Sequence, residues 1–280
     1  MPRFAIAAVL VVLSGQARAE PFVRGSSEVG LARVDVSDSD GATTAETGLA
    51  ARAAALVVPS AHVELGLRLG IAYLSTDEAG TRRYANPILD FALVGDLDRF
   101  HLRGGWSIAL PLADVRVLAG TRFDQDAATL AAAARVWGPW DAWQWTPGWA
   151  TVVAPLAASF AASDRVTLKG ELTTGLSFAT GERLTNDDLT IWITQAALGG
   201  EVDVGRGIWL GGRLLGVTIV VPDQNPLFAA STYGYHDETD GALELGGGVR
   251  FTSFAVSALA AISFEDAGSP GVSLGVATWR

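Results

Sequence analysis

The chain has 280 residues, of which 49% are hydrophobic and 18% are charged, with a formal net charge of −10 at pH 7 and no cysteine. The missing cysteine excludes a disulfide-stapled scaffold and a zinc site built on thiolates. The acidic balance, with Lys169 as the only lysine, argues against a nucleic-acid partner, because phosphate recognition needs clustered Lys and Arg.

Residues 1–19 have the pattern of a cleaved secretory signal. Arg3 supplies a basic start, residues 4–13 are all apolar, and Ala17 and Ala19 have the small-x-small spacing that a signal peptidase accepts. A permanent anchor helix would need about 17–25 apolar residues. The sequence therefore predicts a signal peptide over 1–19 and one transmembrane β-barrel domain over 20–280.

The mature chain alternates between apolar and polar residues. From Val63 to Tyr73 the odd positions are apolar, while the even positions include Glu64 and Arg68. Period two places one set on each face of a strand. The same alternation recurs in 165–179, 241–251 and 253–264. These segments exceed the roughly five or six residues of a soluble strand and match the roughly 9–11 residues that span a bilayer when tilted.

Short turns alternate with long polar connections along the chain, which is typical of an outer-membrane barrel. The breaks predict twelve strands, at residues 22–36, 46–58, 61–75, 86–95, 99–110, 149–162, 165–179, 189–204, 207–221, 241–251, 253–264 and 271–280. Pro155 would remove a ladder hydrogen bond from the strand 149–162. Ten or fourteen strands therefore remain possible.

The longest connection, residues 111–148, has features of its own. Asp126 can cap a short helix over 127–136. We expect the tryptophans that follow to fold into the barrel mouth as a constriction or stacking platform; the candidates are Trp137, Trp140, Trp143 and Trp145. The alternative is that they pack this loop against the rim of the barrel.

With its signal, alternating strands, turn asymmetry and final strand ending in Trp279 and Arg280, the chain resembles bacterial outer-membrane β-barrel proteins of the porin-like or small-transporter-like kind. The fold class this implies is all-β: a closed antiparallel transmembrane β-barrel of about twelve strands, with a short helix in the long outer loop. The resemblance also implies location in the cell outer membrane. The expected partners are outer-membrane lipid, lipopolysaccharide and the barrel-insertion machinery, and the expected state is a monomer.

Alternation places charges of both signs inside the barrel. The candidates for a lumen filter are Glu64, Arg68, Asp90, Arg103, Lys169, Glu171, Glu201, Arg213, Glu244 and Arg250. Opposite charges across a narrow water-filled lumen would select small polar or ionic solutes. Alternatively, the charges pair with one another and fill a closed barrel, because unpaired charge in a confined lumen is costly.

The sequence thus predicts a passive channel for small polar or aromatic solutes. The alternatives are a closed structural or adhesive barrel with functional loops, and an outer-membrane lipase or protease. We expect no enzyme activity and no cofactor, because the three histidines, His62, His101 and His236, lack the surroundings that an activated nucleophile requires. The acidic outer loops can bind divalent cations or simply remain solvated.

Overall fold

The computed structural model describes residues 22–37, 43–75, 80–113, 115–117, 140–146, 148–180, 190–220, 238–264 and 270–279. Within these ranges, no helix has the length and apolar character needed to cross a membrane. The strands are β1 (Phe22–Ser37), β2 (Thr43–Ser60), β3 (Val63–Ser75), β4 (Gly80–Tyr84), β5 (Ile88–Leu97), β6 (Phe100–Ala109), β7 (Val115–Val117), β8 (Trp149–Ala161), β9 (Val166–Ala179), β10 (Thr190–Gly205), β11 (Ile208–Val220), β12 (Glu238–Arg250), β13 (Phe254–Ser263) and β14 (Pro270–Trp279).

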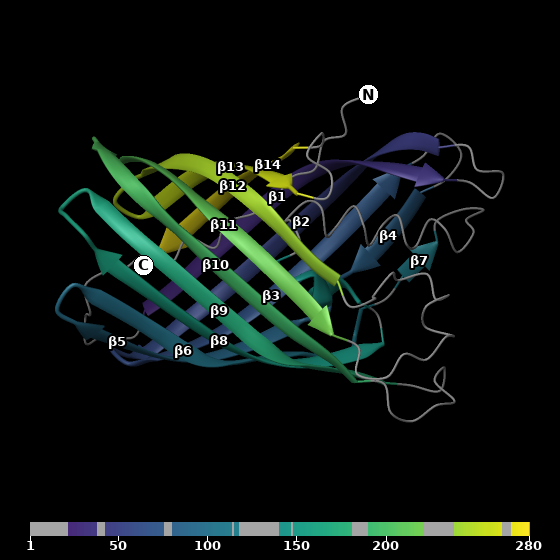
Figure 1. Ribbon diagram of the computed structural model, residues 1–280, viewed down its shortest axis with the longest axis horizontal. Helices are drawn as coiled ribbons and strands as arrows, with labels where there is room; N and C mark the ends of the chain where they lie inside the picture. The colour runs from purple at the N-terminus through teal and green to yellow at the C-terminus, as the bar shows by residue number, and fades with distance from the viewer. Residues whose placement is uncertain are drawn as a thin grey trace.

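The strands form a closed antiparallel barrel (Figure 1). The sheet closes into a ring because β1 pairs with β14 and β2 pairs with β3. Twelve strands form the wall, as predicted. The fourteen labelled segments count as twelve because β4 and β5 pair with successive parts of β3 and together occupy one position in the wall. The short β7 pairs with β4 and adds no further position. The turns β2–β3, β5–β6, β8–β9, β10–β11 and β12–β13 lie together at one end, called here the short-turn end (Figure 1, left).

The strand that contains Pro155 forms as well. In β8, Pro155 lies opposite Thr173 of β9. On the other side, the β6–β8 register skips from Gly104↔Leu156 to Ser107↔Val153. Proline has no backbone N–H to donate, so the interruption falls where a ladder hydrogen bond is unavailable.

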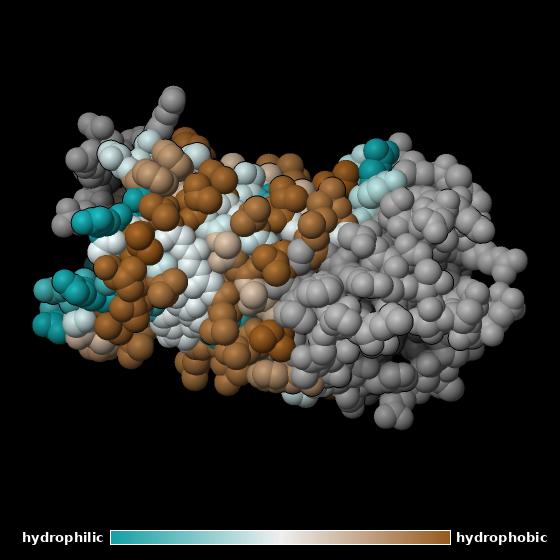
Figure 2. Space-filling view, turned by 90° about the horizontal axis from the view of Figure 1, so that it is seen from above, coloured by the Kyte–Doolittle hydropathy of each residue, from teal (hydrophilic) through white to brown (hydrophobic). Residues whose placement is uncertain are grey.

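The two faces of the sheet differ in chemistry as the alternation predicts. On β3, Leu65, Leu67 and Leu69 point outward and are 39–47% exposed, while Glu64 is buried on the inner face. Apolar side chains cover much of the described outer surface (Figure 2). An apolar outer face is stable in lipid and would aggregate in water. Trp106 and Trp192 also lie on this outer face.

The wall is interrupted where a loop enters the barrel. Residues 85–87 separate β4 from β5, and residues 110–114 separate β6 from β7. Asn86 lies in the first gap and donates its side-chain amide to the carbonyl oxygens of Thr146, at 2.8 Å, and Trp149. Its backbone N–H donates to the carbonyl of Gln144 at 2.8 Å. These bonds from Asn86 hold residues 140–146, called here the inserted segment, at the interruption of the wall.

The inserted segment carries a single 3-10 turn, Ala142–Trp145. The indole of Trp145 is fully buried against Gly70 of β3. A β-carbon at Gly70 would lie 2.8 Å from Cη2 of Trp145, which is closer than real contacts allow. Glycine at this position therefore makes room for the tryptophan. The helix expected over 127–136 lies outside the described residues and is not confirmed.

We predict that the outer face tolerates charge according to depth. Leu198, near the middle of β10, is 72% exposed, and Val204, near the short-turn end, is 50% exposed. Leu198→Arg should lower the free energy of unfolding by about 2–4 kcal/mol, and Val204→Arg by about 0–1 kcal/mol, because arginine is costly only at the bilayer midplane. Denaturant titration of the protein in lipid vesicles measures both, and equal losses would contradict the membrane assignment of this face.

Candidate solute site in the barrel lumen

The barrel encloses a cavity of about 200 Å³. It extends from Arg24, near the short-turn end, to Asp141 and Trp143 of the inserted segment. Its charged lining residues are balanced and belong to two groups, five arginines (Arg24, Arg52, Arg68, Arg103, Arg213) and five carboxylates (Glu28, Glu64, Asp90, Asp141, Glu171).

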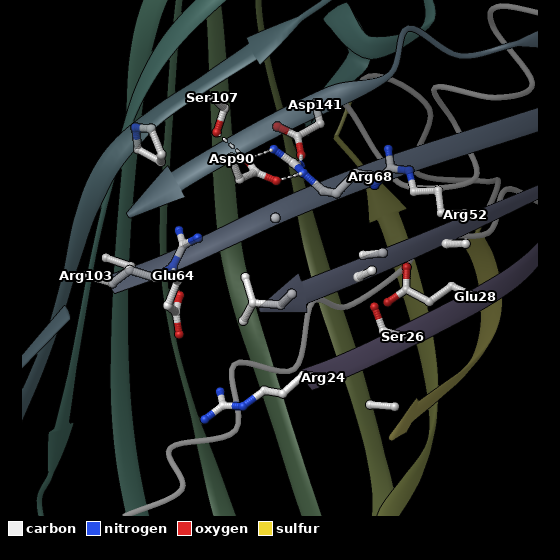
Figure 3. A pocket seen from close by; sticks show the side chains of 18 of the residues that line it. Arg24, Ser26, Glu28, Arg52, Glu64, Arg68, Asp90, Arg103, Ser107 and Asp141 are labelled. Atoms are coloured by element: carbon white, nitrogen blue, oxygen red, sulfur yellow. Dashed lines mark hydrogen bonds and ion pairs between the residues drawn. The ribbon is translucent and has the colours of Figure 1, made fainter. Parts of the chain in front are cut away.

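Arg68 of β3 forms the ion cluster nearest the inserted segment (Figure 3). Its Nε and Nη2 donate to the two carboxylate oxygens of Asp90 at 2.8 and 2.9 Å. Its Nη1 donates to Oδ2 of Asp141 at 2.7 Å. Ser107 of β6 donates its hydroxyl to Asp90. The guanidinium is thus fixed by a two-point contact to the wall and reaches the inserted segment with its remaining nitrogen.

Arg213 of β11 forms a second cluster on the opposite wall. It donates to both carboxylate oxygens of Glu244 and, through Nη1, to Glu171 at 3.1 Å. Its guanidinium also lies 5.0 Å from the ring centroid of Trp140, within the range of a cation–π contact.

The inserted segment therefore spans the lumen. The ring order places five strands between β3 and β11 in either direction, so Asp141 and Trp140 contact opposite walls. Between them, Trp143 packs with Ile88, Val153 and Ile191 from three further strands. Side chains of both kinds, ion-paired and apolar, hold the segment across the barrel.

Further ion pairs lie in the described part of the lumen. Arg103 donates to Glu64 at 2.8 Å. Glu201 accepts from Lys169 at 2.6 Å and from Arg250 at 2.5 Å. A smaller cavity of about 60 Å³ lies beside this cluster, and its lining includes five glycines of β10, β11 and β12.

All ten lumen-filter candidates point inward, and each pairs with another member of the set, as the contacts above show for Glu64, Arg68, Asp90, Arg103, Lys169, Glu171, Glu201, Arg213, Glu244 and Arg250. Their location agrees with the alternation. Their role in selecting solutes stays a prediction.

Three of the four constriction candidates lie in the inserted segment. Trp140 lines the cavity, and Trp143 and Trp145 are buried inside the barrel, 4% and 0% exposed. Trp137 lies outside the described residues. Whether these side chains limit the passage of a solute stays a prediction.

Asp141 and the cavity residues of β1 are not among the residues predicted to line the lumen. Arg24 and Glu28 share the even positions of β1, opposite the exposed Val23, Val29 and Leu31, so strict alternation on that strand would have found them. Asp141 lies in a loop, where no period exists to place it. His101 contacts Asp96 at the short-turn end rather than a nucleophile.

The described residues contain no cluster of three or more His, Asp or Glu side chains that could hold a metal ion. Most residues of the acidic outer loops lie outside the described ranges. Divalent-cation binding by those loops therefore stays a prediction.

No family model matches the sequence, and no curated protein matches it. Among solved structures, the chain is similar to the COG4313 outer membrane channel from Pseudomonas putida F1, with a TM-score of 0.61 and 12% identity over 96% of this chain and 99% of that chain. The chain has the fold of the outer-membrane β-barrels.

Weaker similarity links the barrel to two other structures. The translocator domain of the autotransporter NalP from Neisseria meningitidis gives a TM-score of 0.48 at 13% identity, covering 95% of this chain and 90% of that chain. A deletion mutant of the TodX monoaromatic hydrocarbon channel gives 0.47 at 8% identity, covering 94% and 90%.

We predict that removing one partner of a lumen ion pair destabilises the barrel more than removing both partners. Glu244→Ala should lower the free energy of unfolding by about 3–5 kcal/mol, because it removes the two-point partner of Arg213 inside the barrel and leaves only the contact with Glu171. The double variant Arg213→Met, Glu244→Leu should recover part of this loss. Equilibrium unfolding in denaturant measures both.

The control for this test is Asp96→Asn, which removes the partner of His101 at a position where the aspartate side chain is 64% exposed. Its cost should stay within about 1 kcal/mol, as is usual for exposed pairs. An equal cost for Glu244→Ala and Asp96→Asn would show that the inner pairs are solvated like surface pairs.

Proposed function

We propose that the protein is an outer-membrane channel through which small polar or aromatic solutes pass without energy input. One observation carries the proposal: a closed barrel with an apolar outer face encloses a charged cavity of about 200 Å³. A barrel that was only a membrane anchor would have no need of ten charged side chains around an internal space, since burying charge costs free energy. The similar structure from Pseudomonas putida is itself described as a channel.

The charge balance of the cavity supports weak selection between cations and anions. Five arginines and five carboxylates face the same space, so a solute meets donors and acceptors of both signs. Polar solutes gain hydrogen bonds there, and Trp140 and Trp143 add aromatic faces. The inserted segment provides the narrowest level, because it crosses from β3 to β11.

Location and assembly belong to the same proposal. The apolar belt would face outer-membrane lipid and lipopolysaccharide, and the chain would be exported with residues 1–19 removed, inserted by the barrel machinery and active as a monomer. We also expect that the protein has no enzyme activity.

A second function is favoured by a different observation. The inserted segment places three buried side chains inside the barrel, those of Trp143, Gln144 and Trp145. The charged side chains of the ion clusters are paired with one another. Both features suit a closed barrel whose structural or adhesive work is done by its loops.

Planar-bilayer recording separates the two functions. We expect small, steady currents from the folded wild-type protein and a conductance at least twofold higher for Trp143→Ala, which removes an indole from the inserted segment. Trp106→Ala is the matched control, because Trp106 is 63% exposed on the outer face, and its conductance should equal that of the wild type. An absence of current from both folded wild type and Trp143→Ala would support the closed barrel and end the channel proposal.

A further inference from the structure

Asp141 differs from the other carboxylates of the lumen ion pairs described above. Glu64, Asp90, Glu171, Glu201 and Glu244 are carried by strands of the wall, whereas Asp141 enters the lumen on the inserted segment. Its backbone has a φ of 58°, in the left-handed region that non-glycine residues seldom adopt. The chain therefore places this carboxylate against Arg68 by an unusual local conformation.

Arg68 is built as a fixed receptor for that carboxylate. Asp90 holds two nitrogens of the guanidinium, and Ser107 in turn holds Asp90. The orientation of Nη1 is thus set by the wall, independently of the inserted segment. Asp141 accepts from Nη1 at 2.7 Å, and its side chain is only 10% exposed. A guanidinium with two donors already fixed loses little entropy when it binds a further acceptor.

The position opposite Nη1 of Arg68 suits a negatively charged acceptor. When Asp141 leaves, Arg68 keeps Asp90 as its partner, and Nη1 has lost the carboxylate that accepts from it. Asp141 also attracts Arg52 of β2, which lies opposite Gly70 and thus two residues along β3 from Arg68. A single carboxylate from outside would restore the acceptor that Asp141 provides.

Size and shape limit which carboxylate fits. A cavity of about 200 Å³ suits a small solute. Trp140 and Trp143 line the same cavity, so a ring attached to the carboxylate would share that cavity with two aromatic side chains.

We propose that Arg68 binds the carboxylate group of small monocarboxylate solutes, aromatic ones included, and that Asp141 occupies this position when no solute is present. The inference deepens the proposed channel function, on which it rests, by naming the solute class of the same cavity. A bound solute takes the place of Asp141 on Nη1, which removes one of the contacts that hold the inserted segment to β3.

Isothermal titration of the folded, detergent-solubilised protein with sodium benzoate tests the proposal without requiring any current. We expect Asp141→Asn to bind benzoate at least fivefold more tightly than the wild type, because the internal competitor has lost its charge. Asp141→Ala should act in the same direction. The double variant Arg68→Gln, Asp90→Asn, which leaves the net charge unchanged, should lose benzoate binding.

Two controls make the result specific. Asp96→Asn removes the same charge at the short-turn end and should bind benzoate as the wild type does. Benzamide, the neutral analogue, should not distinguish Asp141→Asn from the wild type. Equal benzoate affinity in Asp141→Asn, Asp96→Asn and the wild type would overturn the proposal. Tighter binding in Asp141→Asn together with a barrel that carries no current would support the site and count only against the channel function.

Discussion

The contact between Arg68 and Asp141 joins the wall of the barrel to the segment that crosses it. Asp90 fixes the guanidinium from β5, and Asp141 meets it from the inserted segment. Loss of Arg68 would leave Asp90 and Asp141 without the guanidinium that they share inside the barrel, whereas loss of Asp141 would leave Arg68 with Asp90 alone. This pair is therefore the charged contact that joins the inserted segment to β3.

The wall is shaped to receive that segment. A continuous strand in place of residues 85–87 would use its backbone groups for the ladder, whereas the interruption lets the backbone N–H of Asn86 donate to the carbonyl oxygen of Gln144. A larger residue at Gly70 would exclude the indole of Trp145. The twelve strands therefore close the wall of the barrel through ladder hydrogen bonds, whereas the inserted segment narrows its lumen through side-chain contacts.

The sequence predicts the wall well and the inserted segment poorly, for a physical reason. A shift of one residue in register would turn every side chain to the other face, so alternation in a long strand fixes inward residues such as Glu64 and Glu244. The position of Asp141 depends instead on contacts with Arg68, more than seventy positions earlier in the chain, and no local period encodes them. The same alternation places Arg24 and Glu28 inside the barrel, but the polar character of their strand makes the alternation hard to recognise.

The central claim is that the lumen opens at the short-turn end and is narrowed at its other end by the inserted segment. In outer-membrane barrels the short turns face the periplasm. Because the sequence has no cysteine, Ser26→Cys, which lines the cavity, gives a single reporter. A bulky water-soluble maleimide dye should label this cysteine at least tenfold faster in cells whose outer membrane has been permeabilised than when added to intact cells. Equal labelling rates under the two conditions would contradict the account.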